Sequence, residues 1–358
     1  MIRSLRGAWS TATPQFKRRL IVIYGFLIAL NVGGWAAIAL ASVKYPILLG
    51  LGLTAYGFGL RHAVDPDHIA AIDNTTRKLM QDGKRPVAVG FFFSFGHSTV
   101  VLLLSVLLAV SATFVKKNLP QFQAMGSVVG TLVSGLFLIG IATINIVVLF
   151  DIVATWKRAV NGGTYDDKTL DAYLANRGFF ARILRPLLRV VGESWAMYPI
   201  GFLFGLGFDT ASEVGLLGMA AATGASGMPI GLILLLPLLF AAGMSLIDTT
   251  DGVAMLGAYG WAFLKPIRKL YYNITITSIS IVVALLIGGV EMLQVIGQES
   301  RAKGAFWDAV ENVPLANLGF YIIAIFLASW LISVIVYRVK RVDDLDAALV
   351  ARRSAAVD

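Results

Sequence analysis

Apolar runs long enough to cross a bilayer constrain the fold of this chain more than any other feature. A transmembrane helix needs about 20 predominantly apolar residues. The chain is 57% apolar and only 14% charged, whereas soluble domains have roughly 25% charged residues. We therefore expect an all-α membrane protein with about eight transmembrane helices. They are predicted at residues 20–41, 46–72, 87–111, 126–150, 195–222, 229–263, 272–296 and 316–338.

Lysine and arginine are distributed unequally among the connections. Twenty-four of the thirty lie in the two tails and in connections 73–86, 151–194 and 264–271, whereas the other four connections hold five. Because cytoplasmic loops carry an excess of basic residues, both termini are predicted to be cytoplasmic. We expect a single transmembrane domain, residues 1–358, with 151–194 as a cytoplasmic loop. The basic stretch 177–189 in that loop is interpreted either as a helix on the inner leaflet or as an ordinary connector.

The composition excludes several kinds of partner and chemistry. The chain has no cysteine, so disulfides and thiolate metal sites are excluded. Its net charge of +9 comes from residues that flank the membrane spans, so no nucleic acid partner is expected. No P-loop is present, so ATP hydrolysis would need another chain. The first run exceeds the roughly 7–15 residues of a signal-peptide core and is interpreted as a retained span.

The motif RHAVDPDHI, Arg61 to Ile69, places charged side chains at the end of the second apolar run. Each charged group costs about 2.5–3.5 kcal/mol at the bilayer centre, so such a cluster needs a use. Imidazoles and carboxylates bind divalent first-row metals. The alternative is a proline kink without a site. The candidate metal ligands are His62, Asp65, Asp67 and His68.

Pro66 determines whether this motif can form one site. On a regular helix, His62 and His68 would point about 120° apart. Pro66 removes an amide donor and disfavours the α conformation at Asp65. We therefore predict a local break that turns both imidazoles into one cavity. Spans 46–72 and 229–263 also exceed a hydrocarbon core of about 30 Å, so each should project from the membrane or unwind at its acidic motif.

Three further motifs interrupt the apolar spans. FFFSFGHST in the third span contains His97, the only other histidine of the chain, which is predicted to face the metal. GLGFDTASEVG in span five contains Asp209 and Glu213, and GMSLIDTTDG in span six contains Asp248 and Asp251. Residues three or four apart share a helix face. These acids are therefore candidates for the same metal site.

Structural roles for these polar residues stay open. The acids can instead pair with Arg61 or Lys265, and Asp251 can cap a helix that restarts near the inner surface. Asn145 in span four is a weaker candidate, because a lone Asn often only bonds a neighbouring helix.

A weak internal similarity suggests a repeat. FSFGHS from Phe93 aligns with FAAGMS from Phe240, and GFGL from Gly57 resembles GLGF from Gly205. Because spans two and five are predicted to run in opposite directions, we hypothesise an inverted repeat. It relates spans two to four to spans five to seven, with the site at their interface.

Together, the four motifs resemble the nickel/cobalt transporter family (NiCoT). The family signature RHAxDADHI is matched with Pro66 in place of the usual alanine, and LGFDTATE is matched with Ser212 in place of threonine. The eight-span layout with a long loop after span four also fits. The motif FSxGHSTVV corresponds to residues 93–101, LGFDTATE to 206–213 and GMxLxDTxDG to 243–252.

The resemblance implies a secondary transporter, not an enzyme, that takes up Ni²⁺ or Co²⁺ across the cell (inner) membrane. The ion would be the cargo, with no resident cofactor and no ATPase subunit required. By that resemblance, the essential signature is His62, Asp65, Asp67 and His68, His97 is a ligand or selectivity residue, and the supporting acids are Asp209, Glu213, Asp248 and Asp251.

The donor chemistry agrees with this interpretation independently. Imidazole suits nickel and cobalt, whereas magnesium and calcium sites use oxygen alone. Only neutral histidine binds a metal, so binding should weaken as the pH falls through about 6.5. The alternatives are a transition-metal exporter, a membrane metal sensor and an intramembrane metalloenzyme. If the metalloenzyme were a zinc protease, the sequence would contain the motif HExxH, and this motif is absent.

Overall fold

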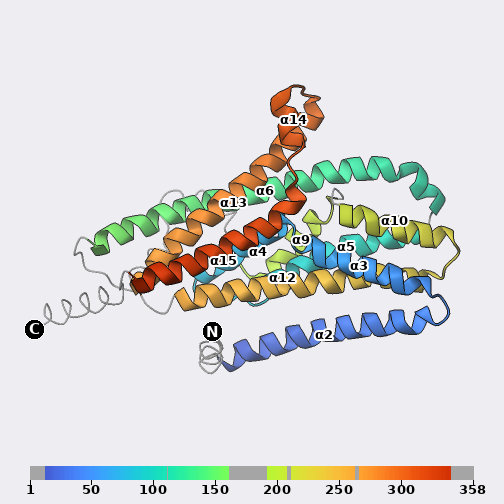
Figure 1. Ribbon diagram of the computed structural model, residues 1–358, viewed down its shortest axis with the longest axis horizontal. Helices are drawn as coiled ribbons and strands as arrows, with labels where there is room; N and C mark the ends of the chain where they lie inside the picture. The colour runs from blue at the N-terminus through green and yellow to red at the C-terminus, as the bar shows by residue number, and fades with distance from the viewer. Residues whose placement is uncertain (1–12, 111, 161–191, 208–210, 263–265, 340–358) are drawn as a thin grey trace, which may run out of the picture.

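The computed structural model describes residues 13–110, 112–160, 192–207, 211–262 and 266–339, and every regular element in them is a helix (Figure 1). The helices form one elongated bundle, from which α14 and the end of α13 project. The elements are α2 (Pro14–Ser42), α3 (Ile47–His62), α4 (Pro66–Gln81), α5 (Val89–Val110), α6 (Ala112–Val160), the 3₁₀ turn η1 (Ser194–Ala196), α9 (Met197–Phe204), α10 (Ala211–Ala225), α11 (Ile230–Ile233), α12 (Leu235–Ala262), α13 (Pro266–Ser300), α14 (Ala305–Glu311) and α15 (Leu315–Val339).

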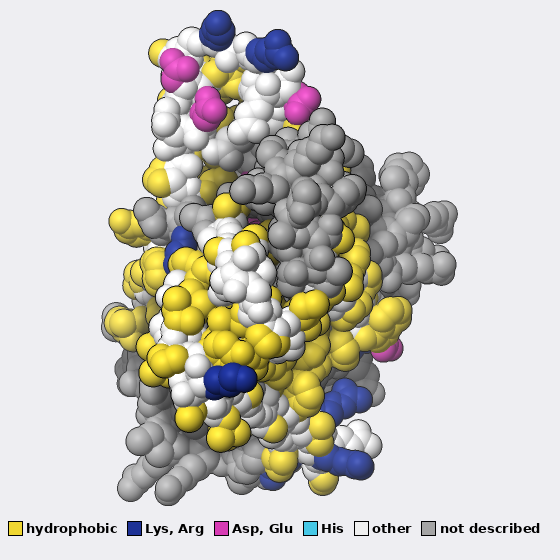
Figure 2. Space-filling view, turned by 90° about the vertical axis from the view of Figure 1, so that its right-hand side faces the viewer, with side chains coloured by type: hydrophobic (Ala, Val, Ile, Leu, Met, Phe, Trp, Pro, Cys, Tyr) yellow, Lys and Arg dark blue, Asp and Glu magenta, His cyan; other side chains and the backbone are white. Residues whose placement is uncertain are grey.

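The helices are those of a multi-pass membrane protein. Among the described residues, five helices are long and apolar enough to cross a membrane, and a sixth span results if the bent pair α3–α4 is counted as one. Apolar side chains cover much of the described part of the face shown in Figure 2. The all-α fold is therefore confirmed, but the described residues do not reach the predicted count of eight. The predicted span 195–222 is divided between α9 and α10, and α15 contributes only a shorter apolar stretch.

The second predicted span is broken at the motif that contains the candidate metal ligands, as Pro66 predicted. Helix α3 ends at His62, α4 begins at Pro66, and the two helices are bent by 51°. Asp65 is extended, with φ −66° and ψ 143°, which is the conformation favoured before a proline. Pro66 takes the first helical position, where an absent amide hydrogen breaks no helical bond.

Helix α4 continues to Gln81, where the sequence predicted a loop over 73–86. Its polar residues are buried: Arg77 is 0% exposed and Lys78 4%. Their partners explain this. Arg77 donates to Asn74 Oδ1 at 2.7 Å, and Asn145 of α6 donates to the same oxygen at 2.7 Å. Asn145 therefore bonds a neighbouring helix, which is the structural role expected for a lone Asn in a span.

The other overlong span stays helical at its acidic motif. Helix α12 runs without interruption from Leu235 to Ala262, so of the two overlong spans only the one containing Pro66 unwinds at its motif. Asp251 lies in the middle of α12, and its interpretation as a helix cap is therefore wrong. Lys265 and residues 161–191, which include the basic stretch of the predicted loop, lie outside the described residues. Helix α6 itself continues to Val160, into the segment predicted as that loop.

Glycines bring α3 and α12 into backbone contact. A Cβ atom at Gly59 would collide with the backbone carbonyl of Phe240. In the reverse direction, a Cβ atom at Gly243 would lie 3.0 Å from the carbonyl oxygen of Tyr56. Only glycine permits so close an approach between two helices.

The same arrangement holds α5 against α9. A Cβ atom at Gly201 would collide with the carbonyl of Phe93, and one at Gly96 would collide with the carbonyl of Tyr198. Both interfaces thus have a Tyr-x-x-Gly segment on one helix and a Phe-x-x-Gly segment on the other.

Helix α2 is attached to the bundle along one narrow stripe, Leu20, Leu27, Gly34 and Ile38. Tyr56 donates to Asn31 Oδ1 at 2.9 Å, which links α2 to α3. In Figure 1, the start of α2 and the end of α15 lie toward the same, left-hand, end of the bundle.

The glycine contacts generate a prediction about stability. Gly59→Ala should lower the free energy of unfolding by about 1–3 kcal/mol, because the added methyl group meets the Phe240 backbone rather than a movable side chain. Gly57→Ala on the same helix is the matched control, since nothing lies within 4 Å of its Cβ position. Thermal unfolding of the purified proteins in detergent measures both. Equal melting temperatures for the two variants would contradict the close packing.

Candidate metal site

Three histidines from three helices converge inside the bundle. His62 ends α3, His68 lies in the first turn of α4, and His97 comes from α5. One ring nitrogen from each lies within 4.8 Å of the other two, and the ring centroids are 4.7–5.0 Å apart. All three side chains are buried. The bend at Pro66 thus brings the two histidines of the motif together, as predicted, and His97 joins them.

Three donor atoms have the spacing of a metal coordination shell. The Nε2 atoms of His62 and His97 are 2.9 Å apart. Glu213 Oε1 of α10 lies 2.8 Å from His97 Nε2 and 3.7 Å from His62 Nε2. With ligand bonds of about 2.0–2.1 Å, adjacent ligands are about 2.9 Å apart at right angles and about 3.4 Å apart at tetrahedral angles. One ion can therefore contact all three groups with little rearrangement.

Two carboxylates orient histidine rings from behind. Asp65 Oδ2 lies 2.8 Å from His62 Nδ1, and the other oxygen of Asp65 accepts from Arg61. On the other side of the site, Asp248 Oδ2 lies 3.2 Å from His68 Nδ1. A carboxylate on one ring nitrogen fixes the tautomer and directs the other nitrogen toward the metal.

The site also contains buried atoms that a ligand can satisfy. His68 Nε2, His97 Nδ1 and Asp248 Oδ1 are buried without a hydrogen-bond partner in the part of the chain that the structure describes. Leaving such an atom unsatisfied costs about 1–3 kcal/mol. His68 Nε2 is the nitrogen that remains when Asp248 holds Nδ1, so it is available to an ion.

Comparison with known proteins identifies the family. The sequence pattern of the family described as high-affinity nickel-transport protein (NicO) matches residues 48–336. The chain belongs to this family. It is 51% identical over 346 residues to a high-affinity nickel transport protein of Cupriavidus necator, which covers 96% of this chain and 99% of that protein.

The other relatives are named for nickel or for cobalt. Nickel transporter NixA of Staphylococcus aureus is 47% identical over 319 residues, covering 88% of this chain and 94% of that protein. Cobalt transport protein NhlF of Rhodococcus rhodochrous is 40% identical over 333 residues, covering 90% of this chain and 93% of that protein. No solved structure matches the chain. The resemblance inferred from the four motifs is confirmed.

The structure separates the predicted acids of this family member into groups. Glu213 faces the histidines directly, whereas Asp65 and Asp248 hold their rings. Asp67, beside His68 in α4, is only partly buried. Asp251 lies one turn after Asp248 on α12 and within electrostatic range of it and of Asp73. Asp209 lies outside the described residues.

Two neighbours of the site have roles that their motifs did not reveal. Ser94 donates to Asp248 Oδ2 at 2.7 Å and so holds the carboxylate that orients His68. Ser212 Oγ lies 3.4 Å from His62 Nδ1. The sequence feature that could have indicated these roles is proximity: Ser94 lies three residues before His97, and Ser212 directly precedes Glu213.

Glu213 provides the sharpest test of the coordination shell. Glu213→Gln removes a charged oxygen that lies 2.8 Å from His97 Nε2, so Co²⁺ affinity should fall more than about 100-fold. Glu291→Gln is the matched control: Glu291 is also a buried glutamate on a helix, but it accepts from Ser134 at 2.8 Å. Visible absorption during Co²⁺ titration of the purified proteins measures the difference. Unchanged affinity in Glu213→Gln would exclude Glu213 as a ligand.

Asp248 is expected to act through His68. Asp248→Asn keeps the shape but loses the charge that holds the ring, so Co²⁺ affinity should fall about 10–100-fold. Calorimetric titration measures the loss, with Asp308→Asn on the projecting α14 as the control. An affinity equal to that of the control would refute an orienting role.

Proposed function

We propose that this protein takes up nickel or cobalt ions across the cell (inner) membrane as a secondary transporter. The observation that carries the proposal is the cluster of His62, His68, His97 and Glu213, buried inside the bundle of a chain from the nickel-transport family. The named nickel and cobalt transporters among its relatives support both ions as candidate substrates. No resident cofactor, catalytic activity or ATPase partner is part of the proposal.

The proposed ligands are the three histidines and Glu213. Nitrogen donors favour late first-row metals such as cobalt and nickel over magnesium and calcium. Three carboxylates contact histidine rings, those of Asp65, Glu213 and Asp248. Asp65 is paired with Arg61, which offsets its charge, and Glu213 and Asp248 contribute two further negative charges. That number matches the charge of a divalent ion, so desolvation of the ion is offset within the site. Among the other acids predicted for the site, we assign Asp65 to orientation and keep Asp67, Asp209 and Asp251 as supporting acids.

The burial of the site supports alternating access. His62, His68 and His97 are each at most 2% exposed, so an ion held by them would be shielded from water. An ion can enter and leave such a site only if the helices around it move. The membrane potential supplies about 2.3 kcal/mol per charge per 100 mV, or about 4.6 kcal/mol for a divalent cation moving inward.

The architecture that we propose has eight spans and an inverted repeat within one permease domain, residues 1–358. Its support is the pair of glycine interfaces. Equating Tyr56 and Gly59 with Tyr198 and Gly201 makes the α3–α12 interface correspond to that of α9 with α5. This register differs from the one suggested by sequence, which aligned Gly57 with Gly205. The breaks after α3 and α9 then also correspond.

The proposed orientation places both termini in the cytoplasm, together with the loop that includes residues 161–191. The strong excess of lysine and arginine in alternate connections supports it. The shared end of the bundle at which α2 begins and α15 ends is consistent with an even number of spans.

Uptake of radiolabelled nickel and cobalt by cells that express the chain tests the function. Cells with the native chain should accumulate at least one metal, and their ratio gives the selectivity. His68→Ala should reduce accumulation to background because it removes a proposed ligand. Glu291→Gln, away from the histidine cluster, should retain most of the uptake.

The assay also distinguishes the alternative functions. Faster loss of metal from preloaded cells would indicate an exporter. No transport in either direction, with the protein present in the membrane, would leave a metal sensor as the better interpretation. Uptake that is unchanged in His68→Ala would refute the proposed site.

A further inference from the structure

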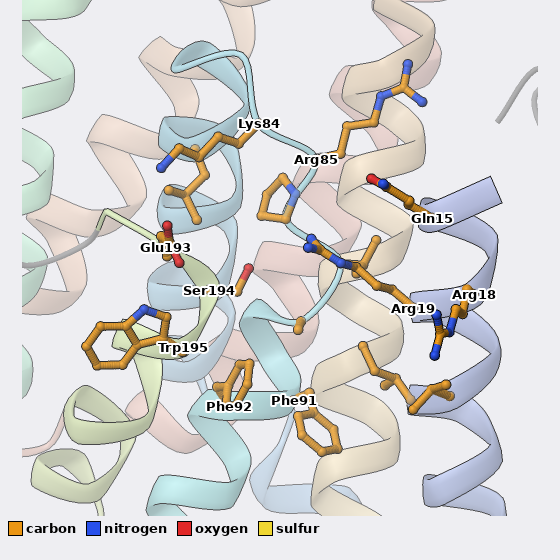
Figure 3. Close-up of a pocket in the computed structure, with 16 residues that line it drawn as sticks. Gln15, Arg18, Arg19, Lys84, Arg85, Phe91, Phe92, Glu193, Ser194 and Trp195 are labelled. Carbon is orange, nitrogen blue, oxygen red and sulfur yellow. The ribbon is translucent and has the colours of Figure 1, made fainter. Parts of the chain in front are cut away.

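A cavity of about 870 Å³ opens at the end of the bundle where α2 begins, away from the histidines. It lies between the first turns of α2, the connection from α4 to α5, and η1 (Figure 3). The charged side chains that line it are Arg18, Arg19, Lys84, Arg85 and Glu193, which together carry a net charge of +3. No part of the metal site lines it.

The basic groups are available to an anion. Arg18, Arg19, Lys84 and Arg85 are all exposed, and none pairs with a carboxylate within the part of the chain that the structure describes. Lys84 Nζ donates to the carbonyl of Gly192 at 2.5 Å, and the Arg85 guanidinium lies 6.0 Å from the ring centre of Phe16. In Figure 3, Arg19 extends from α2 into the cavity, while Arg18 and Arg85 stand at its rim.

The cavity changes character along the axis of α2. Lys84 and Arg85 lie toward the end of the cavity where α2 begins, with Arg19 extending between them and the aromatic rings, whereas Phe91 and Phe92 line the part beside the later turns of α2 (Figure 3). Trp195 lies at the border and is 59% exposed. Tryptophan concentrates at the headgroup level of membranes. The cavity is therefore polar toward the start of α2 and apolar beside its later turns, as a headgroup with attached acyl chains would require.

We propose that this cavity binds the headgroup of an anionic phospholipid, such as phosphatidylglycerol or cardiolipin. Arginine and lysine groups contact the phosphate, and the first part of the acyl chains lies against Phe91 and Phe92. Basic pockets between transmembrane helices at the cytoplasmic side suit such headgroups. The bound lipid bridges α2, which is attached by only a narrow stripe, to η1 and to the α4–α5 connection.

Native mass spectrometry and thermal unfolding of the delipidated protein, without metal, test this. Phosphatidylglycerol or cardiolipin added to this protein should stay bound in the mass spectrum and raise the melting temperature. Added phosphatidylcholine should do neither. Inorganic phosphate at equal concentration should give no shift, because it lacks the apolar part. If phosphate reproduces the full shift, or if phosphatidylcholine stabilises equally, the proposal is overturned.

A pair of variants locates the binding. Arg19→Gln with Lys84→Gln should weaken binding of the anionic lipid about thirty-fold, since each basic group near a membrane surface contributes about 1 kcal/mol. The matched control is Lys44→Gln with Lys303→Gln: both are exposed lysines, and neither lines the cavity. The control pair should bind lipid as the native chain does. Equal lipid binding by both double variants would overturn the assignment to this cavity.

Discussion

The bend between α3 and α4 is the constraint on which the rest of the site depends. On a continuous helix, His62 and His68 would point about 120° apart. With the helix interrupted over three residues, their ring centroids are 4.7 Å apart. The interruption costs little free energy. Pro66 has no amide hydrogen that could be left without a partner, and a proline favours an extended conformation in the residue before it. A single local feature thus produces the convergence of ligands from separate helices.

Convergence alone would not keep polar groups in the buried interior of the bundle, because each needs a hydrogen-bond partner where water is absent. The site meets this need through a second layer of contacts. Asp65 lies between Arg61 and His62, and Ser94 holds the carboxylate that contacts His68. Backbone packing at glycines closes the helices around this layer. In such a low-dielectric interior, a satisfied network is strong and a broken one is costly, so ligand geometry and helix packing depend on each other.

The features that could be predicted from the sequence are those with local causes. The break follows from proline chemistry at one position. The convergence could be inferred from that break and from the occurrence of all three histidines of the chain in two consecutive predicted spans. Features that depend on distant partners could not be predicted. The polar half of α4 has the composition of a loop, but it is buried because Asn145 of α6 and Ser280 of α13 bond it. Similarly, the spacing of the acids predicted which of them share a helix face. It did not predict that Glu213 lies between two histidines, or that Asp65 contacts the ring nitrogen of His62 that is turned away from them.

The proposed ligands divide across the bend in a way that bears on the proposed transport. His97 contacts both Glu213 and His62, whereas His68 is held by Asp248 of the unbroken α12. Because His62 and His68 belong to the two halves of the bent pair, any change in the angle between α3 and α4 moves one group of ligands relative to the other. An ion held by both proposed groups would lose ligands when these groups separate. The same break that assembles the site is therefore the place where a small rotation would most reduce its affinity.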